Sequence, residues 1–300
     1  MNAHSQHLID KGIPWGRFKE FISLEADRFT ILKKLLDEAE LEYTILELSG
    51  NRHFVLAPTP PEESYLRRTP NILVAHYDRA EGSPGANDNS ASVFLLFEAA
   101  VRLKKSNIKN WVIIFTDKEE IKSGESVMDQ GSYALASGLK TIQMDNVKIF
   151  CFDACGTGDT IVVSNTLEYL TRKEEGGEKI RESLIALRQF AMKTATDLGA
   201  VKVLLAPTPF SDDAGFFRAG VAAQTITMLP SAECVNLVAE LRKNPAFAEN
   251  LITGDMRQGS NARIIPQTWR YLNTPSDSYL RLTPQYFRNV VRFAEALCKG

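Results

Sequence analysis

The sequence predicts an α/β fold of three layers, in which helices cover both faces of a central mixed, mainly parallel sheet. Two observations support this prediction. Short apolar runs that suit buried strands alternate along the chain with segments of helical periodicity. Near the start, two alternating segments flank a Ser-Gly-Asn turn, which is typical of an antiparallel hairpin. Because no repeat or break in composition divides the chain, we expect a single domain over residues 1–300.

Helices are expected where apolar residues recur three or four positions apart and charged residues lie on the other face. An N-terminal helical segment, residues 1–42, contains one long helix or two that separate near Ser23. The last helix follows Thr283-Pro284, an N-cap with proline at the first helical position. The expected helices cover residues 15–39, 91–105, 126–137, 180–198 and 284–297.

Strands are expected in the hairpin and at the continuous apolar runs. The hairpin joins residues 42–48 to residues 52–57, and a proline-rich surface loop over 58–63 follows it. Continuous apolar runs suit strands that are covered on both faces. These runs cover residues 72–75, 111–115, 147–152, 201–205 and 224–229. A polar stretch with Gly and Pro over residues 243–267 predicts a long connection or a lid.

Composition narrows the class of partner. The chain has 35 basic and 37 acidic residues, so we expect neither nucleic acid nor an anionic membrane surface as a partner. No run reaches the roughly 18 consecutive apolar residues that a membrane helix needs, and Met1–Gly12 lacks the apolar core of a signal peptide. Four cysteines are too few for a disulfide framework. A cytoplasmic protein is expected, and its oligomeric state is left open.

Acidic side chains and one histidine follow several of the predicted strands. This set consists of His76, Asp78, Glu119, Glu120, Asp153, Asp212 and Asp213. In parallel α/β sheets, ligands bind beyond the carboxyl ends of the strands, so these side chains are expected at one edge. So many carboxylates would repel one another unless a cation lay among them. A histidine with carboxylates suits zinc, one ion or two, with manganese or cobalt as alternatives.

Each member of this set also has an ordinary structural explanation. Taken alone, His76 would more often be a structural histidine than a metal ligand. The acids at 119–120 and 212–213 could lie at helix N-termini, where they interact favourably with the helix dipole or act as caps. Asp153 could be a turn residue before a glycine. The metal site is therefore inferred from the set and not from any one residue.

Six segments in sequence order resemble one family of enzymes. They read VAHYD, PGANDNSAS, FTDKEE, FCFDACGTGDT, FSDDAGFFRAG and LNTPSDS. With them the chain is similar to the co-catalytic zinc exopeptidases, which include bacterial leucyl aminopeptidases, aminopeptidase Y and the glutaminyl cyclases. The resemblance runs from Asn71 to the C-terminus. It implies a zinc-exopeptidase catalytic domain with a mixed sheet between helix layers.

The resemblance also implies metal ligands. His76 and Glu120 would bind one ion, Asp153 would bind a second, and Asp88 would bridge the two. The family's last ligand is a histidine in a His-Thr-x-x-Asp pattern, whereas this chain has Asn273 at that position. The amide oxygen of Asn273 could replace the imidazole, but it is a neutral and weaker ligand for zinc.

Further roles are implied for four acids that are not ligands. Asp78 would hold the imidazole in the correct tautomer, and Glu119 would be the general base. Asp212 and Asp213 would bind substrate or support the site, although the family's third residue in the block Ser-Asp-His is replaced here by Asp213.

Two main functions follow from the sequence. The first is a metal-dependent exopeptidase that acts on small peptides, and among exopeptidases an aminopeptidase is favoured. Because Asn273 replaces the last histidine, the alternative is a catalytically impaired zinc-peptidase-like protein that serves in binding or as a scaffold. A single-metal acyl transferase like the glutaminyl cyclases is the third and least favoured reading.

Overall fold

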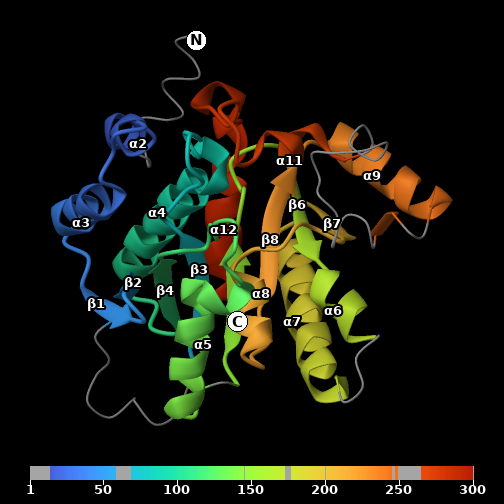
Figure 1. Cartoon of the computed structure of the whole chain (residues 1–300), viewed down its shortest axis with the longest axis horizontal. Helices are drawn as coiled ribbons and strands as arrows, with labels where there is room; N and C mark the ends of the chain where they lie inside the picture. The colour runs from blue at the N-terminus through green and yellow to red at the C-terminus, as the bar shows by residue number, and fades with distance from the viewer. Residues whose placement is uncertain are drawn as a thin grey trace.

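A single eight-stranded sheet forms the centre of the fold. The computed structural model describes residues 14–58, 69–144, 146–172, 177–199, 201–244, 247–248 and 265–299. The strands are β1 (Tyr43–Leu48), β2 (Asn51–Leu56), β3 (Asn71–His76), β4 (Trp111–Thr116), β5 (Lys148–Phe152), β6 (Thr160–Ser164), β7 (Lys202–Ala206) and β8 (Gln224–Leu229). They lie in the order β1-β2-β4-β3-β5-β8-β6-β7 (Figure 1).

Most strands in the sheet are parallel to their neighbours. The central strands β4, β3, β5 and β8 pair in parallel, and β6 pairs in parallel with β7. The β1–β2 hairpin, the β2–β4 pair and the β6–β8 pair are antiparallel. The mixed, mainly parallel sheet and the N-terminal hairpin that the sequence predicts are thereby confirmed.

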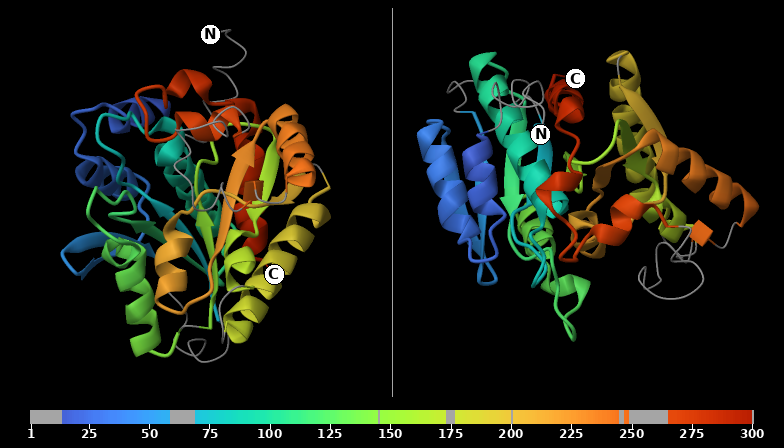
Figure 2. Two further views of the ribbon diagram at one scale, coloured as in Figure 1. Left: turned by 45° about the vertical axis from the view of Figure 1, so that its right-hand side comes forward. Right: turned by 90° about the horizontal axis from the view of Figure 1, so that it is seen from above.

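Helices cover both faces of the sheet because strand side chains alternate between them. The helices are α2 (Trp15–Phe21), α3 (Arg28–Glu38), α4 (Ser92–Lys105), α5 (Gly131–Thr141), α6 (Thr166–Thr171), α7 (Glu178–Asp197), α8 (Asp212–Arg218), α9 (Ser231–Lys243), α11 (Gln267–Tyr271) and α12 (Phe287–Leu297). Leu73 and Ala75 of β3 pack in one core with α4, α7 and α12, while Ile72 and Val74 pack in another with α5 and α8 (Figures 1 and 2).

The described part of the N-terminal segment, residues 14–42, contains two helices, which is the second of the two expected arrangements. Asp27 caps the second helix, because its side chain accepts a hydrogen bond from the backbone N–H of Thr30 at 3.1 Å. Phe18 and Phe21 of α2 both make edge contacts with the ring of Phe94 in α4. Burial of these rings fixes the helical pair against the main body of the fold.

Some elements differ from the sequence-based expectation. The sequence does not predict strand β6 or helix α9. Strand β6 has five residues, all buried, and it lies between β8 and β7. Its apolar run is short and follows a turn that contains two glycines. Helix α5 begins only at Gly131, because a short 3₁₀ turn occupies 127–129, and a similar turn precedes α12. The predicted loop beyond residue 58 and most of the predicted lid over 243–267 lie outside the described residues.

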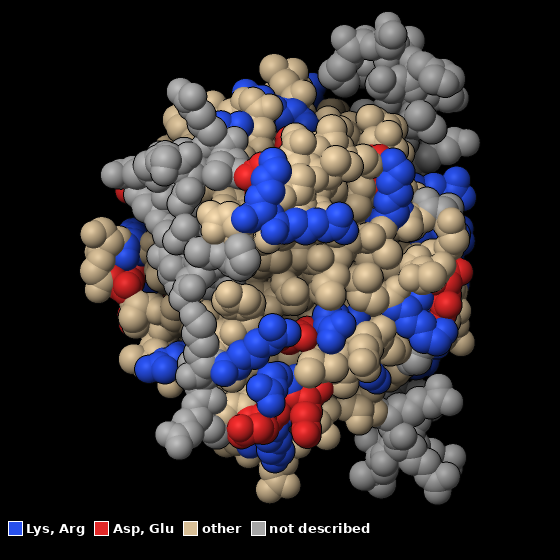
Figure 3. Space-filling view, turned by 90° about the vertical axis from the view of Figure 1, so that its right-hand side faces the viewer, with Lys and Arg blue, Asp and Glu red and all other residues tan. Residues whose placement is uncertain are grey.

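Charged side chains on the outside are distributed in groups. On the face drawn in Figure 3, Lys and Arg lie in separate groups, with Asp and Glu beside several of them. Within the described part of the chain, no helix is both long enough and apolar enough to span a membrane.

The packing of α2 on α4 gives a stability prediction. Phe94→Ala removes a completely buried ring and leaves a cavity, so we expect it to lower the free energy of unfolding by about 3–5 kcal/mol. Leu280→Ala is the control, because Leu280 is 75% exposed and its loss is expected to change stability by no more than about 0.5 kcal/mol. Urea unfolding of the metal-free proteins measures both. Equal values for the two variants would contradict this account of the core.

Candidate active site

The site lies where β3, β4 and β5 end. His76 is the last residue of β3, and loops after the three strands carry Asp88, the Glu119–Glu120 pair and Asp153. These four acids line a cavity of about 390 Å³ together with Asn273, which follows α11. The structure thus brings acids from the loops after three different strands, which are far apart in the sequence, to one cavity. This is expected for the carboxyl edge of such a sheet.

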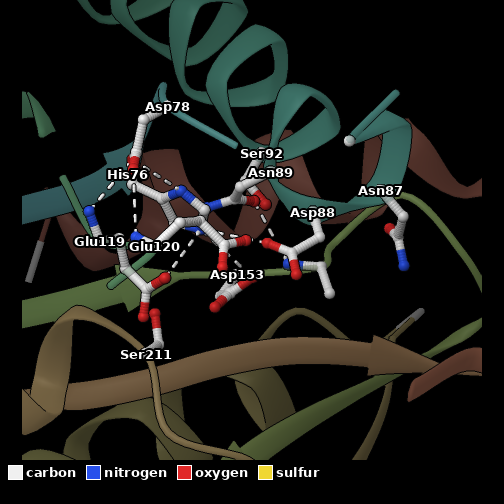
Figure 4. Close-up of polar contacts among 12 residues, drawn as sticks. His76, Asp78, Asn87, Asp88, Asn89, Ser92, Glu119, Glu120, Asp153 and Ser211 are labelled. Atoms are coloured by element: carbon white, nitrogen blue, oxygen red, sulfur yellow. Dashed lines mark hydrogen bonds and ion pairs between the residues drawn. The ribbon is translucent and has the colours of Figure 1, made fainter. Parts of the chain in front are cut away.

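His76 is completely buried and has a carboxylate on each side of its ring. Its Nδ1 lies 3.3 Å from Oδ1 of Asp78, and its Nε2 lies 3.2 Å from Oδ1 of Asp88 and 3.9 Å from Oδ1 of Asp153 (Figure 4). Burial opposes a charge on the imidazole, but the carboxylates of Asp78 and Asp88, one beside each ring nitrogen, outweigh it and raise the pKa of His76 well above its usual value.

The donor set at Nε2 fits a divalent metal ion. His76, Asp88 and Asp153 each offer one ligand atom, and these atoms all lie within 4.8 Å of one another. Buried polar atoms normally have partners, yet Oε1 of Glu120, Oδ1 of Asp153 and Oδ1 of Asn273 have no hydrogen-bond partner among the described residues. One imidazole with carboxylate and amide oxygens is a donor set that suits zinc.

Glu119, Glu120 and Asp153 are destabilised in their ionised forms. Burial, and next the neighbouring Asp88, raise the pKa of Glu120 to about 9 and that of Asp153 to about 7. Burial likewise raises the pKa of Glu119 well above its usual value, although His76 opposes this shift. A bound cation would lower all three pKa values, because it stabilises the ionised form of each acid.

Asp78 connects the histidine to the acidic pair. Its two carboxylate oxygens accept the backbone N–H groups of Glu119 and Glu120 at 3.1 and 3.0 Å. Burial acts to raise its pKa, but the adjacent imidazole of His76 and the hydrogen bonds from these N–H groups outweigh burial and lower it. One ionised carboxylate therefore fixes the imidazole and the loop that follows β4.

Glu119 is held by a residue that the sequence did not single out. Nε2 of Gln130 donates to Oε1 of Glu119 at 3.1 Å and to its backbone carbonyl at 3.0 Å. Oε2 of Glu119 lies 4.0 Å from Nε2 of His76. The carboxylate is therefore oriented toward the same side of the imidazole as Asp88 and Asp153. No local pattern marks Gln130, which precedes α5.

Hydrogen bonds from three sides fix the loop that carries Asp88. The carboxylate of Asp277 accepts the backbone N–H groups of Asn87 and Asp88 at 2.9 and 3.0 Å. Oδ1 of Asn87 accepts the N–H of Gly156 at 2.7 Å, and the side chain of Asn89 bonds to the carbonyl of Phe152 at 2.8 Å. The peptide bond between Asp88 and Asn89 is cis. These contacts join the loops that carry Asp88 and Asp153.

Asp212 and Asp213 lie behind the cavity and are not among the residues that line it. Both are in the first turn of α8. Asp212 accepts the hydroxyl of Thr116 at 2.7 Å, and Asp213 accepts the N–H of Ser211 at 3.0 Å. Burial raises the pKa of Asp212 to about 6 and that of Asp213 to about 7. They support the loop before α8; a contact with substrate stays a prediction.

A histidine among carboxylates, at the carboxyl edge of a mainly parallel sheet, is an arrangement that suits a metallohydrolase. Residues 55–297 match the model of peptidase family M28. Because this match covers most of the chain, the protein belongs to peptidase family M28. Family membership confirms the resemblance that the sequence predicts and the expected enzyme class, a zinc metallopeptidase. A search of curated protein sequences gave no match.

Solved structures share the fold at low sequence identity. The LapA aminopeptidase of Legionella pneumophila matches with a TM-score of 0.61 and 16% identity, over 99% of this chain and 73% of that chain. The glutaminyl cyclase of Bacteroides thetaiotaomicron matches with a TM-score of 0.57 and 16% identity, over 90% of this chain and 87% of that chain. The zinc aminopeptidase BSAP of Bacillus subtilis matches with 0.52 and 17%, over 82% of this chain and 48% of that chain.

The raised pKa of Asp213 predicts a pH-dependent stability. Because the folded state holds this proton up to about pH 7 and the unfolded chain only to about pH 4, the free energy of unfolding falls as the pH rises through that range. Asp213→Asn carries no charge and keeps an oxygen for the N–H of Ser211. We expect its free energy of unfolding, relative to that of the wild type, to rise by about 2–3 kcal/mol between pH 5 and pH 8, because most of the pH range between the two pKa values lies in this interval.

Urea unfolding of the metal-free proteins at both pH values measures this difference. Asp197→Asn is the control, because Asp197 is exposed and its exchange removes the same charge without changing a buried group. If Asp213→Asn and the wild type lost the same stability between pH 5 and pH 8, the buried carboxyl of Asp213 would not be the cause.

Proposed function

We propose that this protein is a zinc-dependent aminopeptidase that removes N-terminal residues from small peptides. The observation that supports this most is the position of Glu119, whose carboxylate shares a cavity with the donor set formed by His76, Asp88 and Asp153. A carboxylate beside a metal site, but not needed as a ligand, can accept and return a proton. The metallopeptidase class follows from the family; the aminopeptidase specificity is our proposal.

Zinc would be held by His76, Asp88 and Asp153, with the free oxygens of Glu120 and Asn273 at the same cavity. When bound, zinc supplies a Lewis acid that activates water and polarises a carbonyl. Asp78 would keep the proton on Nδ1 of His76, so that Nε2 remains free for the metal.

In this proposal Glu119 accepts the proton of the attacking water and returns it to the leaving amine. Gln130 orients the carboxylate, because it donates to Oε1 and leaves Oε2 facing His76. A general base works best when its pKa lies near the working pH. Burial provides an upward shift of the pKa of Glu119, and a nearby cation provides the opposing one.

The charge and size of the cavity favour a small peptide with a free N-terminus. Among the described residues that line it, four are acids and one, Arg270, is basic, so an ammonium group is attracted to the acidic end. The volume of about 390 Å³ is near the lower end of the range for small-molecule sites, about 300–1,000 Å³. A cytoplasmic location and the lack of nucleic-acid or membrane partners stay predictions.

Replacing the general base separates metal binding from turnover. Glu119→Gln preserves the shape of the side chain but cannot accept a proton, so we expect zinc content to be unchanged and kcat to fall by about 10²–10⁴. Glu125→Gln is the matched control: it removes a carboxylate from the same loop, where Glu125 accepts a hydrogen bond from Lys118 at 2.8 Å. Metal analysis and hydrolysis of aminoacyl anilides and dipeptides measure the two effects.

Three outcomes of this experiment decide between functions. If the Glu119→Gln variant hydrolysed substrates at the wild-type rate, another group would be the base. A wild-type protein that retains no zinc and hydrolyses no substrate would favour the scaffold alternative, which the replacement of the family's histidine by Asn273 supports. Cyclisation of glutaminyl peptides without cleavage would favour the acyl transferase.

A further inference from the structure

Arg28 is a buried cation at the start of α3. It lies against the loop of residues 77–91, which joins β3 to α4. The residue is only 6% exposed. No carboxylate of the described residues forms an ion pair with its guanidinium group. Burying a cation without such a partner is unfavourable unless other groups solvate the charge. The groups that solvate Arg28 therefore indicate what it does.

Five of the six hydrogen bonds made by the guanidinium group go to the 77–91 loop. Nη1 donates to the carbonyls of Tyr77 and Asp78, at 3.2 and 2.8 Å. Nη2 donates to Pro84 and Gly85 carbonyls and to the Ser90 hydroxyl. The sixth bond, from Nε, goes to the carbonyl of Phe21. Arginine has five N–H donors in a rigid plane, so the loop takes the four N–H donors of Nη1 and Nη2, and Phe21 takes the fifth.

The loop approaches the guanidinium group so closely that residue 85 has no room for a side chain. Gly85 has φ of +58°, and a Cβ on it would lie 2.6 Å from the carbonyl oxygen of Asp88 and 2.8 Å from Nη2 of Arg28. A side chain at this position would displace either the backbone of Asp88 or the arginine. Gly85 therefore lies between the carbonyl of Asp88 and the guanidinium group of Arg28, in close contact with both.

A second arginine makes the reverse connection. Arg79, in the loop, donates through its guanidinium group to the carbonyls of Ser23, at 2.7 Å, and Leu24, both in the turn between α2 and α3. The loop thus binds the helical pair and the helical pair binds the loop. Arg28 and the turn precede residue 55, where the match to the peptidase family begins.

The charge of Arg28 also acts on the acids of the site. Asp78, Asp88 and Asp277 all stabilise the charged guanidinium group, while burial and the like charge of Arg79 disfavour it and lower its pKa to about 9. The attraction is mutual, so the charge of Arg28 offsets part of the repulsion among these carboxylates.

We propose that Arg28 and Arg79 form a reciprocal clasp through which the N-terminal helices hold the 77–91 loop in its zinc-binding shape. Arg28 is a positioning residue, because it contacts the backbone on both sides of the donor set and no atom of the cavity. The proposal rests on the zinc site proposed above. Mutation of a residue that positions metal ligands typically lowers the metal affinity 10–100-fold.

The test measures zinc affinity directly, by competition with a chromophoric zinc chelator. We expect Arg28→Met to weaken zinc binding about 100-fold, and Arg28→Lys about tenfold, because lysine keeps the charge but has only three donors. Arg79→Met is expected to weaken it about tenfold. Arg17→Met is the matched control: Arg17 lies in α2 and bonds to Glu20 and Glu38 on the outside of the same helical pair. It is expected to bind zinc like the wild type.

Thermal unfolding of the metal-free proteins separates positioning from general stability. A purely structural role would lower the unfolding temperature of the Arg28 variants while their folded form bound zinc normally. If Arg28→Met does not fold, Arg28→Lys and Arg79→Met decide. The clasp would be refuted if these two variants bound zinc as tightly as the wild type, or if Arg17→Met weakened binding equally. A wild-type protein that binds no zinc would instead contradict the proposed function.

Discussion

Repulsion among buried carboxylates is the constraint on which the rest of the structure depends. Four acids line one cavity around a completely buried histidine, and burial raises the pKa of several of them. Buried like charges are stable only when cations or hydrogen-bond donors compensate them. Most of the contacts around the site supply such compensation, either from backbone N–H groups or from a buried cation.

Compensation and positioning come from the same hydrogen bonds. Asp78 and Asp277 each accept two backbone N–H groups, and these lie in the loops that carry Glu119, Glu120 and Asp88. A carboxylate that is stabilised in this way also fixes the backbone that donates to it. The site is therefore built from acids of two kinds: those with satisfied oxygens, which organise the loops, and those with free oxygens, which are available for a metal ion.

The N-terminal helices have a direct connection to this site, although they lie outside the matched family region. Aromatic packing holds α2 against α4, and Arg28 reaches from α3 to the loop before α4. The helical pair, the loop and α4 therefore form one packed unit beside β3 (Figures 1 and 2). A change in the helical pair could in this way reach the metal ligands without any contact with substrate.

The sequence by itself determined the fold class, most strands and helices, and the residues that end the strands, because periodicity and short motifs are local properties. It missed the five-residue β6, whose apolar run is too short to stand out. Only the tertiary structure decided which donors satisfy the acids. Arg28 donates to the backbone carbonyl of Asp78 across 50 positions, and the carboxylate of Asp277 accepts the backbone N–H of Asp88 across 189, and no local pattern records such contacts. Their existence depends on how the layers pack, so the positions of Arg28, Arg79, Gln130 and Asp277 follow from the fold.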